Sequence, residues 1–140
     1  MTTTDIALYQ AKKRPAVCAE YQSYKVCGMG PPSSGGLAVG QTLGILNHFS
    51  LTDRSPNAPR SLHLIAEAEQ LAFADRAAYV GDSDFVPVPV NGMVDPGYLA
   101  ERAKLISPRH AIEGLADPDP GRAPGFGQCR RRCRRPAAKP

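Results

Sequence analysis

The sequence predicts an α+β fold that consists of one β-hairpin and three or four helices. Two strand-like runs, residues 16–21 and 24–29, flank the dipeptide Gln22-Ser23, and this pattern is typical of a hairpin. Three later segments repeat apolar residues at helical spacing. The chain has 140 residues, of which 42% are hydrophobic, so it can form one small domain with one core. It contains no run of 18 apolar residues, so we expect no transmembrane helix and no membrane partner.

The hairpin prediction includes a register. A two-residue loop at Gln22-Ser23 places four pairs of residues opposite each other: Tyr21 and Tyr24, Glu20 and Lys25, Ala19 and Val26, Cys18 and Cys27. The Tyr–Tyr and Glu–Lys pairs are favourable cross-strand neighbours. The loop residues are unusual, because the primed turns of short hairpins favour Gly or Asn.

The cysteines allow two interpretations. A disulfide between Cys18 and Cys27 is geometrically possible if they form a non-hydrogen-bonded pair of the hairpin. The favoured alternative is two unbonded, small apolar strand residues, because nothing else in the sequence marks an oxidising compartment. Cys129 and Cys133 flank three arginines and lack a second pair of ligands, so they predict no zinc site.

The helices are predicted from apolar spacing and capping residues. Residues 1–10 form a short helix or turn capped by Thr3 or Thr4. A helix over 35–49 has its apolar face at Val39, Leu43, Leu46 and Phe49. The strongest helix covers 61–79, with Ser61 as its cap and Gly81 just after its end, and its buried side is drawn from Leu64, Ile65, Ala68, Leu71, Ala72 and Tyr79.

The remaining chain predicts an irregular segment, one more helix and a tail. Alternating Val and Pro in residues 81–94 disfavour a central strand. Asp95 then caps a helix that has Pro96 at its first position and extends to about residue 106. Residues 1–120 carry a net charge of −3 and residues 121–140 a net charge of +7, and we expect the basic segment to be disordered.

The stretch from Pro31 to Gly36, Pro-Pro-Ser-Ser-Gly-Gly, precedes the first long helix. It lacks the Lys of a phosphate-binding loop and the third glycine of a dinucleotide fingerprint. We favour a strand-to-helix turn, while contact with a ligand through backbone N–H groups at the helix start stays open.

Other polar residues form no chemical constellation. His48, His63 and His110 have no nucleophile or metal partner in the sequence pattern and are expected to be surface or helix-packing residues. Asp82 and Asp84 are too few for calcium, so turn formation is the favoured interpretation. The sequence therefore predicts no catalytic, cofactor-binding or metal-binding residue in this chain, and no cofactor.

Three ordered segments resemble the gamma-glutamyltransferase family, also called gamma-glutamyltranspeptidase or glutathione hydrolase. The first resemblance is the hairpin followed by Pro31–Gly36. The second is a helix ending in Ala74-Asp75-Arg76, followed by the loop with Gly81, Asp82, Asp84 and Phe85. The third is the segment 1–10 before the hairpin.

The resemblance implies an N-terminal-nucleophile hydrolase, whose fold is a four-layer α/β/β/α sandwich. In this family a precursor cleaves itself into a large and a small subunit, and the newly exposed Thr attacks a gamma-glutamyl amide, with its own amine as base. Residues 1–120 resemble the last part of the large subunit only. The chain has Thr2, Thr3, Thr4, Thr42 and Thr52 and no later Thr, so nothing corresponds to the nucleophile, which belongs to the small subunit.

The resemblance thus predicts a fragment that is inactive alone. Its start is expected to be an internal Met, and residues 121–140 are expected to be out of frame. Helix faces without their sheets would make the isolated chain poorly folded and prone to aggregation. The substrates by family are glutathione and gamma-glutamyl compounds. The family is often periplasmic or extracellular, but the start of this chain does not resemble a secretory signal, so the localisation stays open.

An alternative function from another class is a non-catalytic binding protein that uses the basic tail. Such a tail would bind nucleic acid or an acidic partner in a salt-sensitive way. Nucleic acid is disfavoured, because the basic stretch 130–139 has no interleaved aromatic residues and no attached folded motif.

Overall fold

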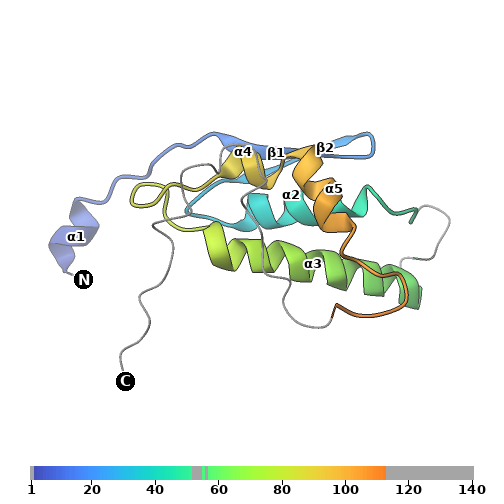
Figure 1. Ribbon diagram of the computed structural model, residues 1–140. Helices are drawn as coiled ribbons and strands as arrows, with labels where there is room; N and C mark the ends of the chain where they lie inside the picture. The colour runs from blue at the N-terminus through green and yellow to red at the C-terminus, as the bar shows by residue number, and fades with distance from the viewer. Residues whose placement is uncertain (1, 52–54, 56, 113–140) are drawn as a thin grey trace, which may run out of the picture.

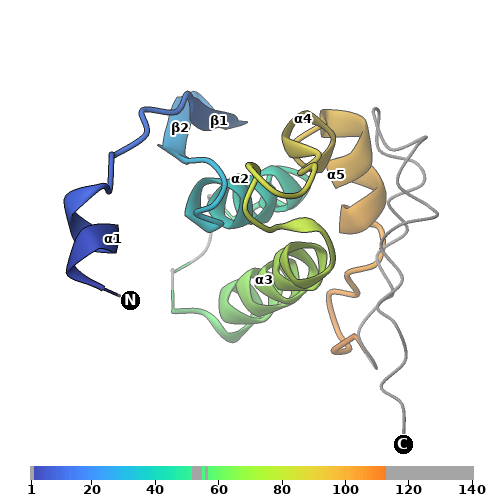
Figure 2. The same ribbon diagram turned by 90° about the vertical axis from the view of Figure 1, so that its left-hand side faces the viewer.

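The structure is arranged around one central helix. In this computed structural model, which describes residues 2–51, 55 and 57–112, helix α2 (Gly35–Leu46) lies between a β-hairpin and the long helix α3 (Pro59–Tyr79) (Figures 1 and 2). Two shorter helices, α4 (Val90–Met93) and α5 (Pro96–Ala103), contact α2 from the side (Figure 2). The part of the chain that the structure describes has no helix long and apolar enough to cross a membrane. The basic tail lies outside the described residues, so its disorder stays a prediction.

The hairpin has the predicted register. Strands β1 (Ala16–Tyr21) and β2 (Tyr24–Met29) are antiparallel, and all four expected pairs lie opposite each other. Val17 is 8% exposed and packs with Leu37 of α2 and Met93 of α4. The hairpin is therefore fixed to the central helix by its inward face.

The tight turn of the hairpin is stabilised by α2. Gln22 has a positive φ of 52°, a conformation that costs a non-glycine residue free energy. The side chain of Asn47, just after α2, accepts a hydrogen bond from the Gln22 N–H (3.1 Å) and donates one to the Glu20 carbonyl (2.9 Å). This tertiary contact explains how the turn forms without Gly or Asn.

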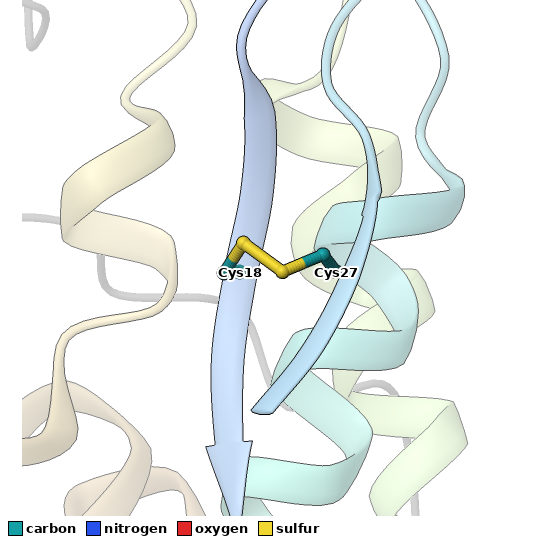
Figure 3. The surroundings of a disulfide bond; sticks show 2 residues. All are labelled: Cys18 and Cys27. Atoms are coloured by element: carbon teal, nitrogen blue, oxygen red, sulfur yellow. A yellow bond between two sulfur atoms is a disulfide. The ribbon is translucent and has the colours of Figure 1, made fainter. Parts of the chain in front are cut away.

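Cys18 and Cys27 form a disulfide (Figure 3). The favoured interpretation of two unbonded cysteines was therefore wrong, and the alternative is confirmed. The Cα atoms are 4.1 Å apart, close to the short spacing of a non-hydrogen-bonded pair. The two-residue turn produces this spacing, because it sets the register that places the cysteines opposite each other.

The buried face of α2 agrees with the predicted one only in part. Leu46 is buried and Phe49 packs against the core, as predicted. Val39 is 49% exposed, while Leu37, Gln41 and Ile45 are fully buried. The reason is the glycines at positions 40 and 44, which bring neighbouring elements close to the helix axis. A Cβ on Gly40 would lie 3.2 Å from the Ala19 Cβ, and one on Gly44 would overlap the Leu99 side chain. Predicted residues 47–49 form tight turns after the helix end, not helix.

The other helices keep their predicted positions with changed ends. Helix α3 begins at Pro59 and uses Ala58 as its N-cap position, so Ser61 does not cap it; the Ser61 hydroxyl instead donates to the Ser55 carbonyl. The predicted Asp95 cap of α5 is confirmed, because its carboxylate accepts a hydrogen bond from the Tyr98 N–H, although α5 ends at Ala103 and not near residue 106. Within the segment expected to be irregular, residues 90–93 form α4.

Helix α1 (Thr3–Ala7) lies apart from the other helices, at the end of an extended arm (Figure 1). Thr2, and not Thr3 or Thr4, caps it. The Thr2 hydroxyl accepts from the Asp5 N–H, and the Asp5 carboxylate accepts from the Thr2 N–H. This reciprocal capping box satisfies two backbone donors with one pair of residues.

We predict opposite effects of two substitutions at the hairpin turn. Asn47→Ala removes both hydrogen bonds to the turn and should lower the stability of the hairpin by about 1–2 kcal/mol. Gln22→Gly relieves the positive φ and should raise that stability by up to about 1 kcal/mol. Amide hydrogen exchange of residues 16–29 measures both changes. Equal exchange in the two variants would contradict the assigned role of Asn47.

Candidate functional site

The structure brings together the two motifs that the sequence singles out. The Pro-Pro-Ser-Ser-Gly-Gly stretch forms the turn between β2 and α2, and Ala74-Asp75-Arg76 lies in the last turns of α3. The Arg76 Nε donates a 2.7 Å hydrogen bond to the Ser34 Oγ. The predicted strand-to-helix turn is thus confirmed, and its second serine is held by the other motif.

Backbone contact explains the glycines of this turn. A Cβ on Gly36 would lie 2.6 Å from the Met29 carbonyl oxygen, and a Cβ on Gly28 would lie 2.8 Å from the Gly36 Cα. No L side chain fits such distances, so the end of β2 touches the first turn of α2 directly. Ser33 supports the turn locally, because its hydroxyl accepts from the Gly35 N–H (3.3 Å).

Asp75, the neighbour of Arg76, points the other way, into the core, where it is 0% exposed. Its carboxylate accepts hydrogen bonds from Gln41 Nε2 (2.8 Å) and Tyr98 Oη (2.7 Å). It also forms an ion pair with Arg102, whose Nη2 lies 2.5 Å from Asp75 Oδ1 and donates to the Leu71 carbonyl. One carboxylate therefore joins α2, α3 and α5.

Burial dominates the electrostatics of this network. It raises the pKa of the Asp75 carboxyl, against the opposing effects of the Arg102 charge and the three hydrogen bonds. Burial also raises the pKa of the Tyr98 phenol, and the Asp75 charge acts in the same direction. Two buried atoms, Gln41 Oε1 and Arg102 Nε, have no hydrogen-bond partner among the residues that the structure describes. The network is a structural cluster with charged members rather than an open reaction site.

The loop after α3 serves as an anchor for the N-terminal arm. Asp84 forms ion pairs with Lys12 (2.6 Å) and Arg14 (2.8 Å), and Arg14 also donates to the Ser83 hydroxyl. Asp82 accepts a hydrogen bond from the Asp84 N–H, which confirms the turn interpretation of this pair. Hydrogen bonds from Lys12 and Arg14 lower the pKa of the Asp84 carboxyl.

A cavity of about 660 Å³ lies between the arm, the hairpin and this loop. Its charged lining residues are Lys12, Arg14, Asp82 and Asp84, and Cys27 and Gly28 contribute from the hairpin. The cavity is thus lined by charged residues of both signs and by Cys27, one of the two cysteines of the disulfide.

A second hollow of about 640 Å³ runs over α2 and α3. Its lining is mostly apolar and includes Leu43, Val39 and Phe73, of which the last two are 49% and 53% exposed. Ser34 and Arg76, the joint between the two motifs, lie at its edge. This apolar groove exposes hydrophobic side chains of both α2 and α3.

The histidines are structural or exposed, as predicted. His63 bonds through Nε2 to the Ser107 carbonyl (2.8 Å), while His48 and His110 are exposed. Residues 2–51, 55 and 57–112 contain no group of three or more His, Cys, Asp or Glu placed to hold a metal ion.

Sequence reasoning missed the partners of Asp75, namely Gln41, Tyr98 and Arg102. A signal for them exists, because each polar residue occupies a helical position in line with buried apolar neighbours. Asp75 follows Ala68 and Leu71 on one face of α3, and Arg102 follows Leu99 on α5. Glu67 was missed for the same reason: it is buried and accepts a hydrogen bond from the Ile112 N–H (2.9 Å).

Comparison with known proteins identifies the relatives of this arrangement. The sequence profile described as Gamma-glutamyltranspeptidase matches residues 1–123. The chain is 39% identical over 107 residues to a glutathione hydrolase proenzyme of Bacillus subtilis, which covers 76% of this chain and 18% of the relative. The chain therefore spans less than a fifth of the length of this relative.

Solved structures agree with the sequence comparison. Gamma-glutamyltranspeptidase from Helicobacter pylori superposes with a TM-score of 0.76 at 34% identity, over 94% of this chain and 36% of that chain. A cephalosporin acylase from Bacillus halodurans superposes with a TM-score of 0.69 at 27% identity, over 76% of this chain and 19% of that chain. The arrangement of hairpin and helices is thus found inside larger chains.

We predict that Asp75→Asn destabilises the fold strongly. The substitution leaves the Arg102 guanidinium buried without a counter-charge, which should cost about 3–5 kcal/mol of the free energy of unfolding. Urea unfolding at low protein concentration measures this loss. Glu101→Gln is the matched control, since it breaks the exposed Glu101–Lys104 pair and should cost less than about 1 kcal/mol. Similar values for the two variants would contradict a central role of Asp75.

We predict that acid releases the N-terminal arm. Because the folded-state pKa of Asp84 is lowered, its contribution is complete above the ordinary carboxyl pKa and is lost as the pH falls through the lowered value. Hydrogen exchange of residues 8–15, normalised to the intrinsic rate at each pH, should increase over that range. Asp84→Asn should show the fast exchange already at pH 7, whereas Glu69→Gln should not. An arm equally protected in Asp84→Asn would show that other contacts hold it.

Proposed function

This chain belongs to the gamma-glutamyltranspeptidase family, and we propose that it supplies the last part of the large subunit of a gamma-glutamyltransferase. The observation that carries the proposal is the joint between the two motifs, in which Arg76 holds Ser34 while Asp75 fixes α3 to its neighbours. The resemblance of both motifs to the large subunit, in the same order, supports this assignment. The substrate class by family is glutathione and other gamma-glutamyl compounds.

In the proposed reaction the chemistry comes from outside the described residues. The N-terminal Thr of a small subunit attacks the carbonyl carbon of the gamma-glutamyl amide, and its own amine accepts the proton. Water or an amino acid then resolves the acyl-enzyme. The described hydroxyls of the motifs serve structure instead, since Ser33 accepts from a backbone N–H and Ser34 accepts from Arg76. We therefore expect this chain to scaffold the catalyst and to be inactive alone.

The apolar groove over α2 and α3 supports the same proposal. In an α/β/β/α sandwich the outer helices bury one face against a sheet. Val39 and Phe73 lie on such a face and are about half exposed, at 49% and 53%. We expect the remaining part of the sandwich, including the small subunit, to cover this groove.

A chimera tests the proposal. The segment of the Bacillus subtilis glutathione hydrolase proenzyme that matches this chain over 107 residues is replaced by the matching residues of this chain. We expect the chimera to cleave itself into two subunits and to hydrolyse a gamma-glutamyl anilide, while the isolated chain releases no anilide.

Two controls make the outcome decisive. The chimera with Asp75→Asn should mature poorly, because α3 is no longer fixed to α2 and α5, whereas the chimera with Glu101→Gln should mature normally. A soluble, matured chimera without turnover would overturn the proposed role. Turnover by the purified isolated chain, above a mock preparation, would overturn the proposed need for a small subunit.

A further inference from the structure

The disulfide lies on the outer face of the hairpin. Figure 3 shows the two sulfur atoms on the side of the strands that faces away from α2. The alternate residues of β1 point inward instead: Val17 is buried, and Ala19 lies against Gly40. Cys18 is half-buried and Cys27 is exposed. The bond between them is thus open to solvent and forms no part of the core.

We propose that this disulfide is a thiol–disulfide exchange site at which a zwitterionic low-molecular-weight thiol attacks Cys27. The thiolate of the small molecule attacks Cys27 Sγ and forms a new S–S bond to it. The Cys18–Cys27 bond breaks, and the electron pair leaves with Cys18 Sγ, which takes up a proton from water. The product is a mixed disulfide on Cys27 and a free thiol on Cys18, with no net oxidation.

A second thiolate completes the exchange. It attacks the sulfur of the bound small molecule, releases Cys27 as a thiolate and leaves as a small-molecule disulfide. In total the two cysteines gain two electrons and two small thiols lose them. The reverse sequence, with the small-molecule disulfide as oxidant, restores the bond.

The choice of Cys27 follows from access. An attacking thiolate must reach the sulfur from the side opposite the bond that breaks. Cys27 is the exposed partner and borders the cavity of about 660 Å³, a volume within the range of small-molecule sites. Cys18 is half-buried and does not line this cavity.

The charges of the cavity favour a zwitterion. Lys12 and Arg14 are both paired with Asp84. The Lys12 side chain is 66% exposed, and its ammonium group has further N–H donors for a carboxylate beyond the one that Asp84 accepts, while the Asp82 carboxylate offers an acceptor for an ammonium group. Because the two signs balance, a purely anionic or cationic thiol gains less. Glutathione, with two carboxylates, one ammonium group and one thiol, has the matching chemistry.

The hairpin does not depend on the disulfide for its register. Six residue pairs align the strands, Val17 packs into the core, and Asn47 holds the turn from α2. Exchange at Cys27 therefore leaves a paired hairpin in which the bond re-forms. The inference goes beyond the proposed function and needs neither a Thr nucleophile nor a second subunit.

Mass spectrometry of the full chain tests the site of attack. Cys129 and Cys133 are first replaced by serine, so that Cys18 and Cys27 are the remaining cysteines. The folded chain is incubated with glutathione, quenched with acid, alkylated and digested. We expect glutathione on Cys27 and the alkylating group on Cys18. Attachment mainly at Cys18, or exchange only after unfolding in urea, would overturn the proposal.

A comparison of two thiols tests the cavity. In Asp82→Asn the side chain can still accept the hydrogen bond from the Asp84 N–H, and the ion pairs of the arm with Asp84 are left in place. The rate of exchange with glutathione should fall by about fivefold, the effect expected of one partly exposed charge, while the rate with uncharged 2-mercaptoethanol should stay unchanged. Ile6→Gln, on helix α1, is the matched control and should change neither rate. Equal effects of Asp82→Asn on both thiols would overturn the cavity as the docking site.

Discussion

The buried carboxylate of Asp75 is the interaction on which the rest of the structure depends. It lies on α3 and binds the side chains of Gln41 on α2 and of Tyr98 and Arg102 on α5. Dehydration of these groups is costly, so the network stabilises the fold only when all its members are present. Helix α2 in turn carries the hairpin, and α3 carries Arg76 to Ser34. The positions of both family motifs thus follow from one carboxylate.

The hairpin could be predicted from the sequence because its determinants are local. Tyr21, Tyr24, Glu20 and Lys25 specify the register through direct cross-strand pairs. The conformation of Gln22 could not be predicted, because the contacts that hold the turn come from Asn47, which lies on another element. The disulfide follows from the same register, which places Cys18 opposite Cys27. The sequence favoured unbonded cysteines only because nothing else in it indicates an oxidising compartment.

The face of α2 and the candidate site were harder to predict. Apolar spacing favoured Val39, yet the helix buries Leu37 and Gln41, because Gly40 and Gly44 provide space for Ala19 and Leu99. Glycine has no side chain and so adds nothing to an apolar pattern. A helix face that is buried through Gly40 and Gly44 is therefore not detected by hydrophobic periodicity. Sequence reasoning overlooked the buried polar residues Gln41, Tyr98 and Arg102, because a polar residue is normally assigned to the surface. Their shared partner, Asp75, can be recognised only from the packing of α2, α3 and α5.

The ion pairs between the arm and the loop have a consequence for the order of assembly. Lys12 and Asp84 are 72 residues apart, Gln41 and Asp75 are 34 apart, and the two cysteines are 9 apart. Because the entropy of loop closure grows with separation, distant contacts form late unless strong packing favours them. The arm has little buried surface. We therefore expect it to dock last during folding and to have a lower free energy of local opening than the core. Because residues of the arm line the cavity beside Cys27, that cavity depends on the ion pairs at Asp84, whereas the core does not.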